Sequence, residues 1–143
     1  MNDSPQILTA ETEAIKDAYA ALNRNDIDGF AKILDPQVER TEPDDFPSGG
    51  TYHGIEAVRA HIAAGRSTWA EGGCEPERFV VAGDKVIVML HVLVRLKDHT
   101  DWIDGHIADV FTFRDGKATQ FRTFGDEREA LEWAGATFES HFG

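Results

Sequence analysis

Asp109 has the surroundings in this sequence that most favour acid–base chemistry. It lies in a segment that alternates like a β-strand, so that every second residue shares one face. The other residues of its face are apolar or glycine, namely Ile103, Gly105, Ile107, Phe111 and Phe113. Because burial among apolar groups disfavours a charged carboxylate, we expect this aspartate to be largely desolvated and its ionisation to be disfavoured. The alternative is that it points at solvent or caps a neighbouring backbone group.

The other chemically active residue types show weaker patterns. The histidines contain neither an HxH nor an HExxH spacing; they are His53, His61, His91, His99, His106 and His141. His91 and His106 are expected on adjacent strands, on the face opposite Asp109, where they could pair. A metal site needs further ligands, so we expect no metal and no other cofactor. Cys74 has no basic neighbour to activate it, so a nucleophilic role is not expected.

Amphipathic helices are expected in the first half of the chain to position these groups. Thr9 or Thr12 can cap the first helix, and residues 1–8 would precede the ordered part. Asp26 can cap a short second helix that Pro36 ends. Residues 37–42 alternate as a short strand, residues 43–50 form a loop, and a third helix follows Gly54.

The second half of the chain predicts an antiparallel meander. Residues 65–73 break the third helix, and strands are expected at residues 79–81, 86–96, 102–113 and 118–124, with a closing helix after Asp126. The dipeptide Asp115-Gly116 is a strong hairpin signal. This order is typical of an α+β fold, in which three to four helices wrap a cone-shaped, curved antiparallel or mixed sheet around one pocket. We expect one domain over residues 1–143, with an ordered core of about residues 9–135.

The inner side of this cone is expected to line the pocket with mostly apolar side chains. The residues predicted to contact a ligand are Tyr19, Phe30, Trp69, Val92, Ile107, Phe111, Phe121 and Thr123. The same side chains could instead fill the core, and both interpretations hold if the narrow end is packed while the mouth stays open. The expected ligand is a small, apolar molecule.

The composition excludes several classes of partner. A formal net charge of −12 opposes binding to nucleic acids and anionic membranes. A single cysteine allows no internal disulfide, and the first residues show no secretion signal, so we expect a cytoplasmic protein. The outer sheet face mixes polar and apolar residues, which suits a homodimer formed through the sheet. Those residues are Met89, His91, Leu93, Arg95, Trp102, His106 and Arg122.

Four stretches of the chain resemble the nuclear transport factor 2-like superfamily. They are residues 20–30 (AALNRNDIDGF), 52–58 (YHGIEAV), 109–117 (DVFTFRDGK) and 124–126 (FGD), in the superfamily's order. Within this superfamily the chain looks like the SnoaL-like polyketide cyclase and ketosteroid isomerase branches. The resemblance implies the cone-shaped fold, but such cones include isomerases, cyclases, dehydratases, epoxide hydrolases and non-catalytic binders.

The isomerase pattern implies roles for two acids. Its catalytic base lies in an acidic-proline step, which is Glu42-Pro43 here, and its protonated hydrogen-bond donor corresponds to Asp109. A base must be charged to remove a proton beside a carbonyl, whereas the donor must be neutral to stabilise the oxyanion that forms. Glu42 could alternatively belong to a solvated acidic loop.

The helix tyrosine of the isomerase has no counterpart at the matching position, which is Ala18. Tyr19 is its neighbour, but one residue turns a helical side chain by about 100°, so we expect Tyr19 to be a poor replacement. Tyr52 or His53, just before the third helix, would then supply the missing group at the pocket mouth.

These features support an acid–base enzyme first, of isomerase, cyclase or dehydratase type, acting on an apolar carbonyl compound. The alternative is a non-catalytic ligand-binding or dimerisation module, which predicts a pocket without converging ionisable groups. A third hypothesis, epoxide hydrolysis, needs an acid–arginine–acid arrangement. Arg95 is expected to face away from Asp109, so this hypothesis ranks last.

Overall fold

The computed structural model describes residues 4–136, with side chains from residue 9 onward. Within this range the elements are α1 (Ser4–Asn23), α2 (Ile27–Ala31), β1 (Leu34–Glu42), β2 (Gly50–His53), α3 (Ile55–Arg66), β3 (Trp69–Ala82), β4 (Lys85–Leu96), β5 (Ile103–Arg114), β6 (Lys117–Phe124) and α4 (Glu127–Trp133). His141 lies outside the described residues. No helix in the described part of the chain is long and apolar enough to span a membrane.

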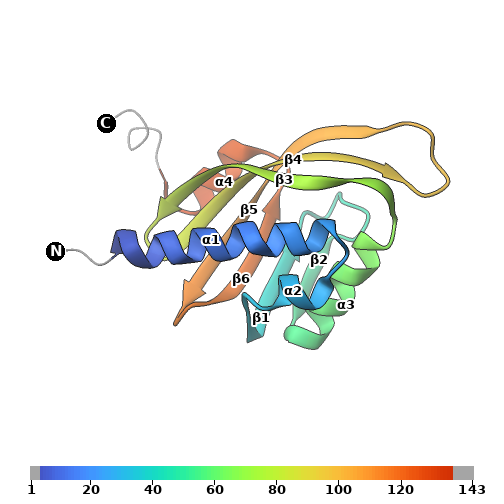
Figure 1. The fold of residues 1–143 in the computed structure, drawn as a ribbon. Coiled ribbons are helices and arrows are strands. Elements are labelled where there is room, and N and C mark those ends of the chain that lie inside the picture. Colours follow the sequence, from blue (N-terminus) through green and yellow to red (C-terminus); the bar gives the residue numbers. More distant parts are fainter. Residues whose placement is uncertain (1–3, 137–143) are drawn as a thin grey trace.

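The six strands form one mixed sheet in the order β2-β1-β6-β5-β4-β3. Strands β1 and β6 are parallel and the other neighbours are antiparallel. Figure 1 shows α1 lying across one face of this sheet, α3 beside β1 and β2, and α4 on the far side. The predicted α+β cone, with helices on a curved mixed sheet, is therefore confirmed.

Two apolar clusters hold the helices against the sheet. The larger lies on the inner face, beneath α1, α2 and α3, and contains Tyr19, Phe30, Phe111 and Phe121. The rings of Phe111 and Phe121 stack with centroids 4.6 Å apart, and Tyr19 meets Phe30 edge-on at 5.5 Å. The smaller cluster lies under α4 on the opposite face. Side-chain alternation along β4 and β5 supplies residues to both clusters.

Local signals in the sequence predicted several boundaries. Asp26 caps α2 by accepting from the Gly29 amide at 2.9 Å, and Asp126 caps α4 through the Arg128 amide at 2.9 Å. The β5–β6 hairpin turns at residues 115–116, where both backbone φ angles are positive. These predictions are confirmed.

The predicted start of the first helix and the predicted end of the second are wrong. Helix α1 begins at Ser4, before either predicted cap, because Pro5 lies in the first turn, where a missing amide hydrogen costs no helical bond. Helix α2 already ends at Ala31, and β1 begins at Leu34. Pro36 is therefore a strand residue, placed where the β1–β6 register is irregular and a proline is tolerated.

The glycine-rich stretch predicted as a break is part of a strand. Strand β3 begins at Trp69 and runs through Gly72 and Gly73, so Cys74 is a buried strand residue rather than a loop residue. Gly72 has a φ of +102°, and a Cβ there would lie 2.0 Å from the Leu93 carbonyl oxygen. Glycine at this position thus permits close pairing with β4. A search for turn residues interprets the same glycine as part of a loop. Strand β2, which pairs with β1, was also not predicted.

Candidate functional site

Asp109 lies on β5 with its carboxyl buried on the inner face of the sheet. Its relative exposure is 4%, and its direct neighbours across the sheet are Val88 on β4 and Thr123 on β6. The inward orientation predicted from alternation is confirmed, except that Ile103 at the start of the strand is 47% exposed.

Two hydroxyl groups hold the Asp109 carboxyl. Thr123 Oγ1 donates to Oδ1 at 2.5 Å, and the Tyr19 hydroxyl donates to Oδ2. Tyr19 reaches this point from α1, ninety positions earlier in the chain. Tyr19 contacts Asp109 because the rotation of a helix on a sheet is decided by packing and not by an aligned position. That Tyr19 is a poor replacement for a second donor to a substrate stays a prediction.

The environment of Asp109 shifts its ionisation toward the neutral form. Burial raises the pKa of the carboxyl, and the charge of Glu42 adds to this effect, whereas Arg40 and the two hydroxyl donors act in the opposite direction. Burial, and then the charge of Asp109, also raise the pKa of Tyr19 well above its ordinary value. The Tyr19 hydroxyl therefore keeps its proton and stays a donor.

Arg40 is a buried member of the site that sequence reasoning missed. Its Nη1 donates to Thr123 Oγ1 at 2.7 Å, and its guanidinium lies 3.9 Å from the centre of the Phe121 ring. Its Nη2 donates to Glu42 Oε2 at 2.9 Å. Arg40 thus connects the Asp109 region to Glu42. The alternation in residues 37–42 was the available signal, since it places residues 40 and 42 on one face.

Glu42 ends β1 within a polar network and not in a solvated loop. Its side chain is 13% exposed and is paired with the guanidinium of Arg40. His61 Nε2 on α3 lies 3.3 Å from Glu42 Oε2, and Ser48 Oγ donates to Oε1 at 3.2 Å. His61 was not predicted as a site residue, because nothing in the spacing of the histidines indicates that α3 packs over the end of β1.

Tyr52 and His53 lie on opposite faces of β2. The Tyr52 ring stacks on His61 with centroids 4.0 Å apart, and its hydroxyl donates to the Ser48 carbonyl oxygen. The His53 side chain is 71% exposed and lies 3.7 Å from Glu39. Tyr52 therefore borders the network, whereas His53 points away from it. The alternation of a strand forces this separation of adjacent residues.

A cavity of about 680 Å³ opens at the end of this network. Glu42 and Thr123 line it, together with residues of the loop after β1 and of the α4 side, including Phe46, Asp126 and Glu129. Asp109 is not among its lining residues and lies behind Thr123. Thr123 therefore both contacts the buried carboxyl and lines the cavity.

Most of the residues predicted to contact a ligand are placed in the core. Tyr19, Phe30, Phe111 and Phe121 are at most 4% exposed, and Trp69, Val92 and Ile107 pack against them. Thr123 lines the cavity. Large aromatic rings fill the inner space of the cone. The alternative interpretation, in which these side chains form the packed core, therefore describes these positions.

Two further groups do not join the site. Burial, and next the charge of Asp109, raise the pKa of Cys74, which keeps its thiol protonated. Arg95 donates to Glu71 at 2.9 Å and to the His99 carbonyl oxygen, so it contacts other groups than Asp109. The arginine that connects the two acids is Arg40, which pairs with Glu42 and reaches Asp109 through Thr123.

Known structures share this architecture. A nuclear transport factor 2-like protein of unknown function from Burkholderia pseudomallei K96243 is 26% identical, with 89% of this chain and 98% of that chain covered at a TM-score of 0.73. TerC, co-crystallised with polyporic acid, is also 26% identical, with 89% and 99% covered at a TM-score of 0.72. A structure described as a putative SnoaL-like polyketide cyclase from Jannaschia sp. CCS1 is 17% identical, with 90% and 94% covered at 0.71.

The sequence comparison agrees with the structural one. No curated protein matches the chain. A family model for the SnoaL-like domain matches residues 15–121, which include Tyr19, Arg40, Glu42 and Asp109. The chain belongs to the SnoaL-like domain family, within the nuclear transport factor 2-like fold.

Proposed function

We propose that this protein is a small-molecule acid–base enzyme of isomerase, cyclase or dehydratase type. The observation that carries the proposal is the buried Asp109 carboxyl, held by Tyr19 and Thr123 and connected through Arg40 to a second acid, Glu42. Two acids in such different surroundings can take opposite roles, one as a proton donor and the other as a base.

The cavity suggests how the roles divide. Glu42 lines the cavity, where its carboxylate can meet the carbon beside a bound carbonyl group, so it takes the role of the base. Asp109 is largely desolvated, which favours the protonated form. When Asp109 is protonated, its hydrogen bond with Thr123 reverses: Asp109 donates to Thr123 Oγ1, and the Thr123 hydroxyl donates to a carbonyl oxygen in the cavity. Glu42 removes the proton beside that carbonyl, and the proton returns to the enolate carbon or assists loss of a hydroxyl group.

The substrate class is a mostly apolar compound with a carbonyl group. The cavity has the size of usual small-molecule sites. The co-crystallisation of TerC with polyporic acid supports including that compound among the ligands tested. One buried cysteine is compatible with action in the cytoplasm.

The alternative, a non-catalytic binding module, is less well supported. It predicted a pocket in which ionisable groups do not converge, whereas Asp109, Arg40 and Glu42 form a connected network. What favours it is the low exposure of Asp109, at 4%.

Epoxide hydrolysis is a second catalytic candidate, because Arg40 pairs with Glu42 and is connected to Asp109 through the Thr123 hydroxyl. In that reaction a proton from Asp109 would pass through the Thr123 hydroxyl to the epoxide oxygen, and Glu42 would take a proton from the attacking water molecule.

The test is a screen of carbonyl compounds, polyporic acid and apolar epoxides with the full-length protein. Hydrogen–deuterium exchange beside the carbonyl and formation of diols are followed by NMR. We expect Asp109→Asn and Glu42→Gln to lower the rate by about 10²–10⁴-fold. Glu39→Gln is the matched control, because Glu39 also lies on β1 but faces the other side, beside His53. Saturable binding without exchange or hydrolysis would support the binding module instead.

A further inference from the structure

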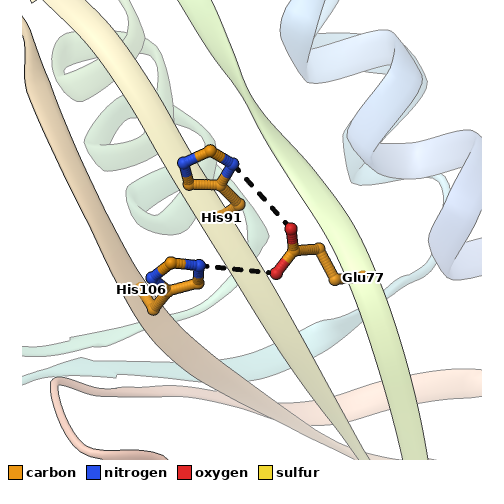
Figure 2. A group of neighbouring side chains, drawn as sticks. All are labelled: Glu77, His91 and His106. Carbon is orange, nitrogen blue, oxygen red and sulfur yellow. Dashed lines mark ion pairs between the residues drawn. The ribbon is translucent and has the colours of Figure 1, made fainter.

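A second group of chemically active side chains lies on the outer face of the sheet, opposite Asp109. His91 on β4 and His106 on β5 are direct cross-strand partners, and their rings stack with centroids 4.8 Å apart. Glu77 on β3 completes the group, at the point where the β3–β4 register is irregular. Figure 2 shows the Glu77 carboxylate directed toward both imidazole rings. One potential ligand atom from each residue lies within 4.8 Å of the others.

The separations within this group suit a shared cation better than direct hydrogen bonds. Glu77 Oε1 lies 3.5 Å from His106 Nε2, and Glu77 Oε2 lies 3.8 Å from His91 Nδ1. Both distances exceed the range of about 2.7–3.2 Å for an N–H···O hydrogen bond. In a tetrahedral site with metal–ligand bonds of about 2.0–2.1 Å, neighbouring ligand atoms are about 3.4 Å apart. The distances from the two Glu77 oxygens are near this value, whereas the three ligand atoms together spread over up to 4.8 Å and have to close around an ion.

Asp104 orients one of the two rings. His91 Nε2 lies 2.7 Å from Asp104 Oδ1, and since a carboxylate can only accept, the ring donates its Nε2 proton there. The other ring nitrogen, Nδ1, lies on the Glu77 side and is the atom available to a metal ion. A carboxylate–histidine pair behind the ligand is the usual support of protein metal sites.

Charge and exposure agree with this assignment. Glu77 and Asp104 carry two negative charges, which match one divalent ion when both imidazoles are neutral. The side chains of His91, His106 and Glu77 are 29%, 55% and 50% exposed, so an ion can reach them and keep a position open to solvent. We propose that Glu77, His91 and His106 form a binding site for a divalent transition-metal ion of the zinc type.

The proposed ion would join three successive strands. Its ligands come from β3, β4 and β5, which are brought together only in the folded chain. Because the ion would bind the folded state and not the unfolded one, it should raise the thermal stability. Because imidazole is a poor ligand for hard cations, Mg²⁺ and Ca²⁺ should not compete.

The test uses full-length protein without an affinity tag, freed of metal with a chelator. Calorimetric titration with Zn²⁺ is expected to show a site with one ion per chain that is lost or weakened about tenfold or more in His91→Ala, His106→Ala and Glu77→Gln. Asp104→Asn should weaken it by about 10–100-fold. His99→Ala is the matched control, because His99 belongs to the β4–β5 loop and contacts the Lys97 carbonyl oxygen.

Co²⁺ provides an independent readout, since a tetrahedral site with imidazole ligands gives visible absorption bands that His106→Ala should remove. Circular dichroism confirms that each variant is folded. The proposal is overturned if these variants bind Zn²⁺ as the wild type does. It is equally overturned if Mg²⁺ displaces Zn²⁺ at similar concentration, since binding would then reflect only the acidic charge of the chain.

Discussion

At the scale of single residues, the network around Asp109 balances opposing effects on one carboxyl group. Burial favours the neutral acid, while Arg40 and the donors Tyr19 and Thr123 favour the carboxylate. Burial is the largest of these effects, so the folded protein binds the Asp109 proton more tightly than the unfolded chain does. This difference links protein stability to pH.

We expect Asp109→Asn to change the pH dependence of stability. The pKa of Asp109 is raised in the folded state, so its contribution is fully present below the unfolded value of about 3.9 and is lost as pH rises through the folded pKa. The asparagine variant lacks this loss. At pH values above the folded pKa of Asp109, the asparagine variant should be more stable than the wild type by about 1.4 kcal/mol per unit of pKa shift.

Urea unfolding of both proteins between about pH 4 and pH 8 measures the free energy of unfolding of each. Subtracting one from the other cancels the contributions of the other carboxyl groups, which the two proteins share. Parallel stability curves for the two proteins would show that burial does not control the ionisation of Asp109.

Removing the charge of Arg40 should destabilise the protein strongly. The side chains of Arg40 and Glu42 are 8% and 13% exposed, so Arg40→Met leaves Glu42 as a nearly buried charge without its partner. Loss of one member of a buried pair costs about 3–5 kcal/mol. In the double variant Arg40→Met/Glu42→Gln, the unpaired charge is gone and part of this stability should return. Denaturant unfolding compares the two, and an equal loss in both would argue against the ion pair as the cause.

At the scale of the elements, β3 depends on a glycine that a sequence scan associates with turns. Gly72→Ala would combine a positive φ with a Cβ in contact with the backbone of β4, so we expect a loss of about 2 kcal/mol or more. Gly105→Ala on β5 is the control, because its Cβ would meet no atom within 4 Å and its φ is not in the left-handed region. Thermal unfolding should show a clearly lower midpoint for the first variant, and equal midpoints would contradict the backbone clash.

At the scale of the whole molecule, α4 covers one part of the outer sheet face and leaves another part open. The open part, near the β4–β5 hairpin that extends from the body in Figure 1, exposes Leu93 and Trp102 by 40% and 48%. We propose that two copies of the chain pair through this surface, since isologous homodimers are the commonest oligomers.

Leu93→Glu should then convert the dimer to a monomer, because the pairing would place two like charges against an apolar surface. Size-exclusion chromatography with light scattering measures the mass. Val81→Glu is the control, as Val81 is equally exposed, at 40%, but lies at the far end of β3. A wild-type mass of one chain at micromolar concentration would refute the dimer.

The sequence by itself determined those features that depend on neighbouring residues. Alternation along residues 103–114 placed Asp109 on the buried face, and the caps at Asp26 and Asp126 and the turn at residues 115–116 were predicted for the same reason. A strand's side-chain period and a cap's hydrogen bond are set within a few residues, so no tertiary information is needed.

Only the tertiary structure decided which of these groups meet. Arg40 contacts Thr123 across eighty-three positions, because β1 inserts parallel to β6, and Tyr19 contacts Asp109 because α1 packs with that face on the sheet. The group of Glu77, His91 and His106 likewise requires three strands in a specific register. Strand order, register and helix rotation result from burying the whole apolar surface at once, which local spacing does not encode.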